Sequence, residues 1–439
     1  MKKGVGKKSH KWRCFLIAGA VILALAGCGQ KEDESINLAD STNEEKRVVN
    51  LFCPIGKSDP NADNVSKTAQ EKTVLMAEKK LGLTVNYRTY TADDYQDKTY
   101  DDVVMDRVRN KMDDFYLLNP DVIQVLGTEG LLVDLSGLDA AENLREVVKT
   151  GATVDGKLVA IPQEVVAHGL FLNEDLFKEY GLSLPESPEE FLECCRVFQK
   201  NGIETPIGAN RWWLENFVFA QAYADLYNGG HTTEEIAALN SGERKYSDYM
   251  RPGFEFLQEL IDKGYLDAQK AYESEAIEGE REDFLAQKTP VVMAYWGAAN
   301  ADTAYGSPDF NMKVTGFPSD RGPMPVVTIT GYGIVAGAEH LEDAMKTLDV
   351  ILSDEALQLY ADNNQVISPS KNVTVDCIDA LKPLNDRVNE GVYVLGSNPN
   401  MNVEQWGNVC LLVRELLNGA SVDECMQKLD QLQEEALRP

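Results

Sequence analysis

Short apolar segments of strand character alternate with helical segments over residues 48–126, and this alternation limits the possible folds most strongly. The run "VVNLFC" (48–53) and the alternating "LTVNYRTY" (83–90) are typical of strands. Residues 67–82 and 100–112 have helical composition and spacing. Strands that alternate with helices form a largely parallel sheet that helices cover on both faces. The sequence therefore predicts an α/β fold.

Further apolar runs continue this pattern along the chain. We interpret "PDVIQVLG" (120–127) as a short strand that ends at Gly127. "DGKLVAIP" (155–162) indicates a hairpin or strand that leads into "HGLFLN" (168–173). A second unit with the same organisation as the first is therefore expected.

Three helices carry residues that are typical of helix starts. Asn173 is a predicted N-cap, and acidic residues follow it in the first turn. Ser187 with Glu190, and Ser421 with Glu424, form predicted capping boxes. These helices are expected to begin directly after their capping residues.

The first 27 residues have the composition of a secretory signal. They contain six Lys and Arg and no Asp or Glu, and an apolar run extends from about Cys14 to Ala26. This run is too short for a helix that spans about 30 Å of hydrocarbon. A basic start, a short apolar core and small residues before a cleavage point are typical of a signal peptide.

The order Leu25-Ala26-Gly27-Cys28 resembles the lipobox of bacterial lipoproteins. In that family the Cys thiol is lipidated, and the Cys becomes the N-terminus after cleavage. An ordinary signal peptide with an unrelated Cys is the alternative. The polar stretch that follows buries too little apolar surface to offset its ordering entropy. The predicted parts are a signal peptide (1–27), a lipidated Cys28 with a flexible tether (28–46), and a folded part from residue 47.

The remaining chain is long, acidic and contains several cysteines. About 390 residues are too many for one core, so two lobes are expected. Without the six basic residues of the signal, the net charge falls from −29 to about −35, which argues against nucleic acid or anionic lipid as a direct partner. Six Cys remain beyond Cys14 and Cys28; their spacing selects no disulfide pairing, and buried free thiols are the simpler interpretation.

Several segments in a fixed order carry a family resemblance. They are the lipobox, "PDVIQVLG" with "LLVDLSGL" (131–138), residues 155–198, residues 282–300, "GYGIVAG" (331–337) and residues 416–436. In these segments the chain resembles the extracellular solute-binding proteins of family 1, the sugar-binding group that serves ABC importers. No segment is specific alone, but their order and spacing are.

The resemblance implies a two-lobe periplasmic-binding-protein-like fold (type II) with discontinuous α/β lobes, a hinge and a ligand cleft between the lobes. The expected boundaries are 47–165 plus 315–365 for lobe I and 166–314 plus 366–439 for lobe II. The chain is expected to pass between the lobes near 162–168, near 314–318 and near "NNQVIS" (363–368). Closure about the hinge is the usual motion of this architecture.

The resemblance also implies a function. The protein is expected to bind an extracellular carbohydrate, in particular an oligosaccharide, and to deliver it to the permease subunits of an ABC importer. It is expected to be a monomer on the extracytoplasmic face of the cell membrane, held by its lipid anchor, without cofactor or enzymatic activity. Two alternatives stay open: the same fold binding a peptide or another polar solute, and a surface lipoprotein that acts as a glycan hydrolase or adhesin.

Aromatic side chains are the first candidates for the cleft, because a sugar ring offers apolar C–H faces. The resemblance makes Trp296 the leading candidate, with core packing as its alternative. Trp212 and Trp213 are adjacent, so they face different directions on a helix, and Trp213 is the preferred one. Trp406 is a further candidate, although packing is its simpler role. Tyr332 lies between two glycines that let the backbone approach a ligand, or it belongs to a plain turn.

Four polar residues complete the candidate set. Asn210 is placed to hydrogen-bond a hydroxyl or to cap a helix. Gln163 and Glu164 stand beside the first expected passage between the lobes, where they can contact a ligand from the hinge. Asp59 follows the first strand, in a loop where members of the family often supply a polar contact.

Neither a metal site nor a catalytic centre is predicted. "DPNADN" (59–64) has the first oxygens of a calcium loop, but Asn64 replaces the required Gly and Gln70 the final Glu. The mature part has three His and none of the common hydrolase or phosphate-binding motifs. A carboxylate pair for glycoside hydrolysis is not excluded by the composition, but no local pattern selects one.

Overall fold

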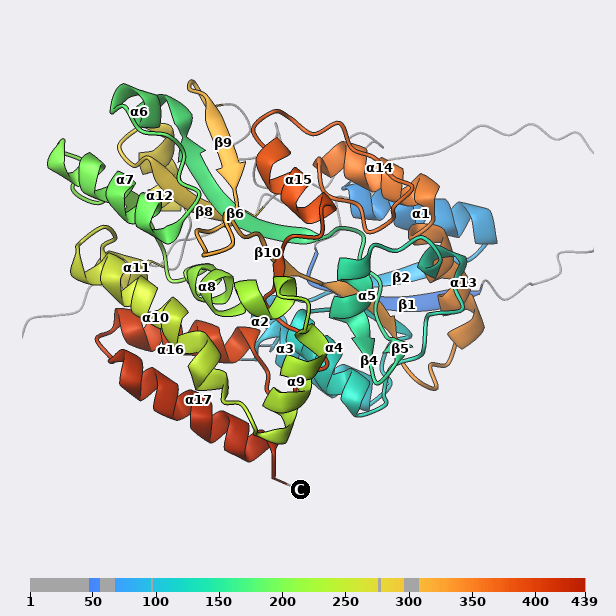
Figure 1. The fold of residues 1–439 in the computed structure, drawn as a ribbon. Helices are drawn as coiled ribbons and strands as arrows, with labels where there is room; N and C mark the ends of the chain where they lie inside the picture. The colour runs from blue at the N-terminus through green and yellow to red at the C-terminus, as the bar shows by residue number, and fades with distance from the viewer. Residues whose placement is uncertain (1–46, 56–67, 96–97, 275–277, 296–307, 439) are drawn as a thin grey trace, which may run out of the picture. The chain divides into compact units, whose positions relative to one another are not determined.

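Two larger β-sheets organise the protein, and each collects strands from distant parts of the sequence (Figure 1). The structure is a computed structural model that describes residues 47–55, 68–95, 98–274, 278–295 and 308–438. The predicted signal peptide and tether, residues 1–46, lie outside these ranges. All described residues belong to one compact unit.

The first sheet has four strands in the order β11-β3-β1-β2. Strand β1 (Val48–Cys53) pairs in parallel with β2 (Thr84–Thr89) and with β3 (Phe115–Leu118). Strand β11 (Gly331–Ile334) pairs with β3 in antiparallel orientation. The predicted parallel sheet is therefore confirmed for β1 and β2, whereas β3, which was not predicted as a strand, joins it in parallel and an edge strand from much later in the sequence completes it.

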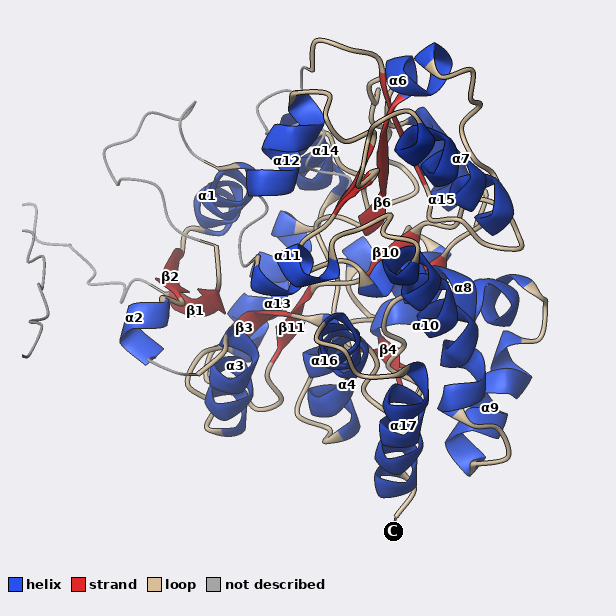
Figure 2. Cartoon of the chain, turned by 90° about the vertical axis from the view of Figure 1, so that its left-hand side faces the viewer, coloured by secondary structure: helices blue, strands red, loops and turns tan. Residues whose placement is uncertain are grey.

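Helices cover both faces of this sheet. Helix α1 (Ala69–Leu81) and helix α3 (Tyr100–Arg109) lie on opposite faces (Figure 2). Thr68 caps α1 with a complete capping box, and Gly82 ends it in the left-handed conformation with a φ of 65°. The predicted end of this helix at Gly82 is confirmed, because a residue without a Cβ adopts that conformation at little cost.

The predicted strand at 120–127 is wrong. The strand there is β3, which precedes it, and the apolar run forms helix α4 (Pro120–Thr128). Asn119 is at the N-cap position and Pro120 at the first helical position, where its fixed φ and missing N–H are tolerated. A short apolar run fits both a buried strand and a buried helix, so periodicity alone did not separate them.

The second sheet is built around β6 (Val166–Asn173). Strand β8 (Val291–Tyr295) lies along one edge of β6, while β9 (Met312–Thr315) and β10 (Val326–Thr328) share the other, all in antiparallel orientation. Two short strands pair in parallel at the margins: β7 (Ile207–Gly208) with β8, and β12 (Val394–Leu395) with β10. This sheet is therefore mixed, unlike the largely parallel second unit that was expected.

Strand β6 contributes to two hydrophobic cores. Ala167 and Phe171 belong to the core that surrounds the first sheet, whereas Leu170 and Leu172 belong to a core formed with the second group of helices. Successive side chains of a strand point to opposite faces, so one strand serves both cores. This is why residues 166–173 are almost continuously apolar.

The remaining helices lie around these two sheets (Figure 1). They are α2 (Ala92–Tyr95), α5 (Glu146–Ala152), α6 (Glu174–Glu179), α7 (Pro188–Lys200), α8 (Glu215–Asn228), α9 (Thr232–Ser241), α10 (Tyr246–Asp262), α11 (Ala268–Glu273), α12 (Glu278–Leu285), α13 (Leu341–Ile351), α14 (Asp354–Asn364), α15 (Lys382–Asn389), α16 (Trp406–Leu417) and α17 (Val422–Ala436). A 3₁₀ turn (Asp139–Ala141) and a small hairpin of β4 (Thr153–Val154) and β5 (Lys157–Leu158) complete the described elements.

The predicted helix starts agree with the structure with one difference. Asn173 caps α6, and Ser421 with Glu424 forms a complete capping box at α17. Ser187 accepts a hydrogen bond from the backbone N–H of Glu190, as predicted. The Glu190 carboxylate, however, accepts from the backbone N–H of Glu186, at 2.8 Å, so this box is displaced by one residue.

The chain first passes from the first sheet to the second between Ile161 and Val166. Ile161 pairs with Tyr332 beside the first sheet, and Val166 already pairs with Thr328 in the second. Near the expected third passage, Ile367 pairs with Val165.

The expected second passage near 314–318 is wrong. Both β9 and β10 pair with β6, so residues 315–328, expected in the first lobe, remain with the second sheet. The chain reaches the first sheet only after 329–330, where β11 begins. The hydrogen bonds of β10 with β6 decide this, and they join residues far apart in the sequence.

The six cysteines of the folded part are free, and all except the partly buried Cys410 are buried. No helix within the described ranges has both the length and the apolar character to cross a bilayer.

Candidate functional site

A cavity of about 490 Å³ is lined by residues from both sheets and from the passages between them. Its volume is in the usual range for small-molecule sites, about 300–1,000 Å³. The lining residues are Asp101, Asn119, Pro120, Asp121, Glu164, Val166, His168, Thr328, Thr330 and Trp406. They stand more than 300 positions apart at the extremes, so tertiary structure alone brings them together.

One wall comes from the first turns of two helices of the first sheet. Asn119 and Asp121 follow the carboxyl end of β3, at the start of α4, and Asp101 lies in the first turn of α3. The Asn119 amide donates a hydrogen bond to the Asp101 carboxylate at 2.8 Å. In α/β proteins, ligands bind at the carboxyl ends of parallel strands, and this wall occupies that place.

The opposite side includes two paired strands of the second sheet. Val166 and His168 are two residues apart on β6, so their side chains share one face, and Thr328 of β10 pairs with Val166. His168 Nε2 lies 3.4 Å from the Thr328 hydroxyl. Thr330 follows in the passage to β11. This side therefore offers hydroxyls and one imidazole.

Trp406 supplies a fixed aromatic surface. Its ring stacks on Phe219 of α8, with centroids 5.5 Å apart and planes 11° from parallel, and lies 5.5 Å from the His168 ring. A Cβ at Gly396 would meet carbon atoms of the indole at 2.5 Å, so the ring lies against backbone that only glycine provides. The indole is therefore held in one orientation beside the cavity.

Three carboxylates line the cavity, and burial raises the pKa of each. The pKa of Glu164 rises to about 7, and the hydrogen bond from the Tyr360 hydroxyl, at 3.3 Å, opposes the rise. Burial raises the pKa of Asp101, opposed by the Asn119 hydrogen bond and reinforced by the nearby charge of Asp121. No Lys or Arg is among the residues that line the cavity.

Asp121 connects the two groups of helices. Its carboxylate accepts hydrogen bonds at 2.8 Å from the Ser397 hydroxyl and from the backbone N–H of Gly407, at the start of α16. Burial raises the pKa of Asp121, and these hydrogen bonds lower it. The start of a helix presents unpaired N–H groups and a partial positive charge, which a carboxylate satisfies.

His168 is neutral in this site. Burial lowers its pKa to about 4, and its side chain is only 6% exposed. Its Nδ1 has no hydrogen-bond partner among the described residues. A neutral imidazole carries one donor and one acceptor, so it suits a hydroxyl.

Metal binding finds no support in the described ranges, where no three His, Cys, Asp or Glu side chains are grouped as ligands. The calcium-like stretch 59–64 lies outside them.

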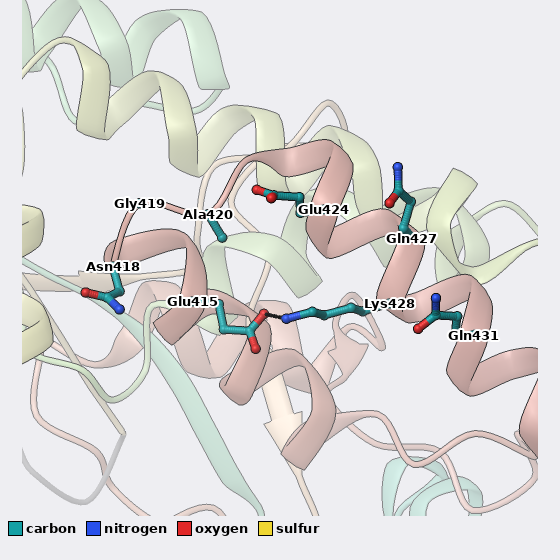
Figure 3. Close-up of a pocket in the computed structure, with 8 residues that line it drawn as sticks. All are labelled: Glu415, Asn418, Gly419, Ala420, Glu424, Gln427, Lys428 and Gln431. Carbon is teal, nitrogen blue, oxygen red and sulfur yellow. Dashed lines mark hydrogen bonds and ion pairs between the residues drawn. The ribbon is translucent and has the colours of Figure 1, made fainter.

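A second hollow, between α16 and α17, differs in character. Figure 3 shows Glu415 and Lys428 directed toward each other across it, and they form an ion pair. Most of its lining side chains are exposed and polar. A shallow solvated surface holds a small polar solute weakly, so the cavity beside Trp406 is the better candidate site.

Comparison of the sequence with known protein families identifies the family of this protein. A profile of the family described as bacterial extracellular solute-binding protein matches residues 62–358, more than half of the chain. The chain belongs to this family. Its fold is the two-lobe α/β fold of periplasmic solute-binding proteins.

Three similar proteins illustrate the relationship of this solute-binding protein to others. A galactooligosaccharide-binding protein of Bacillus subtilis (strain 168) is 29% identical over 188 residues, which span 43% of this chain and 40% of that relative. A solved chitin oligosaccharide binding protein superposes with a TM-score of 0.70 at 18% identity, over 89% of this chain and 99% of the other. A family 1 extracellular solute-binding protein from Bifidobacterium longum subsp. infantis has a TM-score of 0.68 at 16% identity, over 89% and 99%.

Two predicted site residues of this solute-binding protein line the cavity. They are Glu164, beside the first passage, and Trp406, which both packs on Phe219 and faces the cavity. Their contact with a ligand stays a prediction. Trp296 and Asp59 lie outside the described residues, as does Cys28.

Two further candidates lie behind the cavity, in the core of the first lobe. Tyr332 is 1% exposed and its hydroxyl bonds to Gln70 and, at 3.3 Å, to Gln163. Gln163 is buried and donates to the Thr73 hydroxyl at 2.9 Å. Neither is among the lining residues, because both side chains are directed into polar contacts with α1.

The candidates at 210–213 form a separate group before α8. Asn210 is buried, donates to Glu280 and accepts from the backbone N–H of Trp212 at 2.7 Å. Trp212 is 40% exposed, and the Arg414 guanidinium lies 4.2 Å from its ring centroid. Trp213 has a φ of 74° and packs against both cores. The structure does not bring this group to the described cavity.

The sequence did not identify most of the polar lining. The residues missed as ligand contacts are Asp101, Asn119, Asp121, His168, Thr328 and Thr330. A signal for Asp121 existed, since Asn119-Pro120 is typical of a helix start and places Asp121 in the first turn. No local signal marks Thr328 or Thr330, because their position depends on the pairing of β10 with β6.

Proposed function

We propose that this protein is the substrate-binding component of an ABC importer, which captures an extracellular oligosaccharide in the cavity and delivers it to the permease. The observation that carries the proposal is the arrangement of a fixed indole beside carboxylates, hydroxyls and a neutral imidazole. A sugar presents C–H faces to an aromatic ring and hydroxyls to such polar groups.

Each lining group has a distinct task in this proposal. The Trp406 ring covers an apolar face of one sugar unit and excludes water from it. Glu164 and Asp101 accept hydrogen bonds from sugar hydroxyls, and bonds to charged acceptors are stronger than those between neutral groups. The hydroxyls of Thr328 and Thr330 both donate and accept, so they fix the orientation of the ring.

Closure of the lobes is the proposed mechanism of delivery. We assign residues 47–161 and 330–365 to lobe I and residues 166–328 and 366–438 to lobe II, following the strand pairing. Asp121 and Gln124 of α4 reach across to Gly407 and to the Met401 carbonyl. Opening breaks these contacts, and a ligand favours closure by no more than its difference in affinity for the two states.

The names of similar proteins support an oligosaccharide as the ligand. One relative is a galactooligosaccharide-binding protein, and one structural neighbour is a chitin oligosaccharide binding protein. Because the identities are low, these similar proteins support the class of ligand for this chain and do not identify the sugar.

Calorimetric titration with a panel of neutral oligosaccharides, including galactotriose and chitotriose, tests the proposal. At least one member is expected to bind in the micromolar range or tighter, and Trp406→Ala is expected to weaken that binding by about tenfold. Binding of peptides but of no sugar would refute it, as would release of reducing ends from a polysaccharide.

We further propose that the mature protein is a monomer held by lipid on the extracytoplasmic face of the cell membrane. The support is the lipobox at Cys28 and the polar tether after it. Cys28→Ala is expected to abolish acylation, which mass spectrometry of the N-terminal peptide measures. An acylated N-terminal peptide in the variant would contradict the assignment.

A further inference from the structure

We infer that the cavity selects its ligand by charge: it takes an uncharged sugar unit and rejects one that carries a carboxylate, sulfate or phosphate, and Glu164 and Asp101 impose this choice. The inference rests on the proposed function and defines the class of sugar that the site admits.

The lining holds three carboxylates and neither Lys nor Arg. Asp101, Asp121 and Glu164 face the cavity, and burial raises the pKa of the nearby Glu404, to which the charges of Asp121 and Asp101 add. These groups already repel one another. An anionic ligand would add a further negative charge to a partly desolvated site, where like charges are costly.

At two of the three helix starts beside the cavity, carboxylates of the protein already accept hydrogen bonds from backbone N–H groups. At α16, the N–H of Gly407 donates to Asp121. At α3, Asp102 accepts from the backbone N–H of Thr99, and Asp101 adds a second charge to the first turn. At α4, Pro120 has no N–H, and Asp121 lies in the first turn. The usual anion site at a helix start is therefore neutralised at α3 and α16, and at α4 the charge of Asp121 in the first turn disfavours an anion.

The unsatisfied polar group of the cavity is a neutral one. The His168 side chain is buried, with 6% of its surface exposed, and its Nδ1 has no hydrogen-bond partner among the described residues. Because burial disfavours the imidazolium, His168 does not supply a positive charge to an anion. A hydroxyl can satisfy the imidazole nitrogen whether that nitrogen is protonated or not.

Glu164 and Asp101 differ from Asp121 in their remaining capacity to accept hydrogen bonds. Both oxygens of Asp121 accept hydrogen bonds within the protein. The Glu164 carboxylate accepts a hydrogen bond from the Tyr360 hydroxyl, and the Asp101 carboxylate accepts one from the Asn119 amide. A carboxylate has about four acceptor positions, so these two retain capacity for sugar hydroxyls.

The test compares ligands that differ only in charge. Each neutral oligosaccharide that binds, starting with galactotriose and chitotriose, is compared by calorimetry at pH 8 with its derivative oxidised at C6 to the uronate, where the sugar offers that position. The methyl ester of the uronate serves as an uncharged control of similar size. The variants are Glu164→Gln and Asp101→Asn, with Glu234→Gln on the surface of α9 as the matched control.

In the wild type, the uronate is expected to bind about 100-fold more weakly than its parent, and the methyl ester within about tenfold of it. Glu164→Gln and Asp101→Asn are each expected to reduce the discrimination against the uronate by about tenfold, whereas Glu234→Gln leaves it unchanged. Equal affinity of uronate and parent would overturn the inference while leaving a sugar-binding function intact.

Two further outcomes would also overturn the inference. An equal loss of affinity for the uronate and for its methyl ester would show that the site rejects them by size, which overturns the assignment to charge. If no sugar binds, neutral or charged, and another solute does, the proposed function and the inference are both refuted.

Discussion

Replacement of Glu164 by Gln is expected to stabilise the protein at pH 8 and not at pH 5. Glu164 is the cavity carboxyl whose pKa burial raises to about 7, from an ordinary value of 4.5. Because the folded state binds its proton more tightly than the unfolded state, the stability associated with this group is present in full below pH 4.5. It is lost as the pH rises through about 7.

The magnitude follows from the size of the shift. One pKa unit corresponds to about 1.4 kcal/mol, so the whole shift amounts to about 3 kcal/mol, and about 2 kcal/mol of it falls between pH 5 and pH 8. The cavity admits water, which reduces the desolvation, so we expect about 1–2 kcal/mol. Gln has the size of the protonated acid and keeps an acceptor for the Tyr360 hydroxyl.

Urea unfolding of wild type and Glu164→Gln at both pH values measures this difference. The variant is expected to be about 1–2 kcal/mol more stable than the wild type at pH 8 and nearly equal to it at pH 5. Glu234→Gln, on the exposed side of α9, should show no pH-dependent difference. A Gln variant that is equally or less stable at pH 8 would refute the reasoning that burial of an ionised Glu164 costs stability.

Three other outcomes follow from the structure. Trp406→Ala is expected to weaken sugar binding by about tenfold in calorimetry, because the aromatic face is lost. Trp212→Ala, outside the cavity, is expected to change the affinity by less than about twofold. The reverse order would place the site elsewhere. Asp121→Ala is expected to destabilise the protein by about 1–2 kcal/mol in urea unfolding, because the Ser397 hydroxyl and the N–H of Gly407 both lose their acceptor, and an unchanged midpoint would contradict this. The six cysteines of the folded part are free, so six thiols are expected to react with a thiol reagent in denaturant without prior reduction; four or fewer would reveal a disulfide.

Local features that depend on neighbouring residues could be predicted from the sequence. Gly82 ends α1, Asn173 caps α6, and Ser421 with Glu424 caps α17, as their residue types indicate. A cap joins groups within three or four positions, so the same residues meet in nearly any tertiary context. The displaced box at Ser187 shows the limit of this rule.

Other predictions failed or lay apart from the cavity because they depend on distant partners. The run 120–127 suits a strand or a helix by its periodicity, and in the structure the strand is β3, directly before it, while the run itself forms α4. Tyr332 was expected near a ligand on account of its flanking glycines. Its hydroxyl instead meets Gln70, which lies 262 positions away, and no local pattern contains that contact.

The sequence by itself determined the family, the α/β class and the ends of those helices whose capping residues are recognisable, such as α1, α6 and α17. The fold class and the helix caps depend on periodicity and on neighbouring residues, and the family depends on the order of segments along the chain, so all of them can be read without the tertiary structure. Tertiary structure alone decided where the chain passes between the sheets and which side chains line the cavity. Asp101, Glu164 and Trp406 are separated by whole elements of the fold, and only hydrogen-bonded strand pairing and core packing bring them to one place.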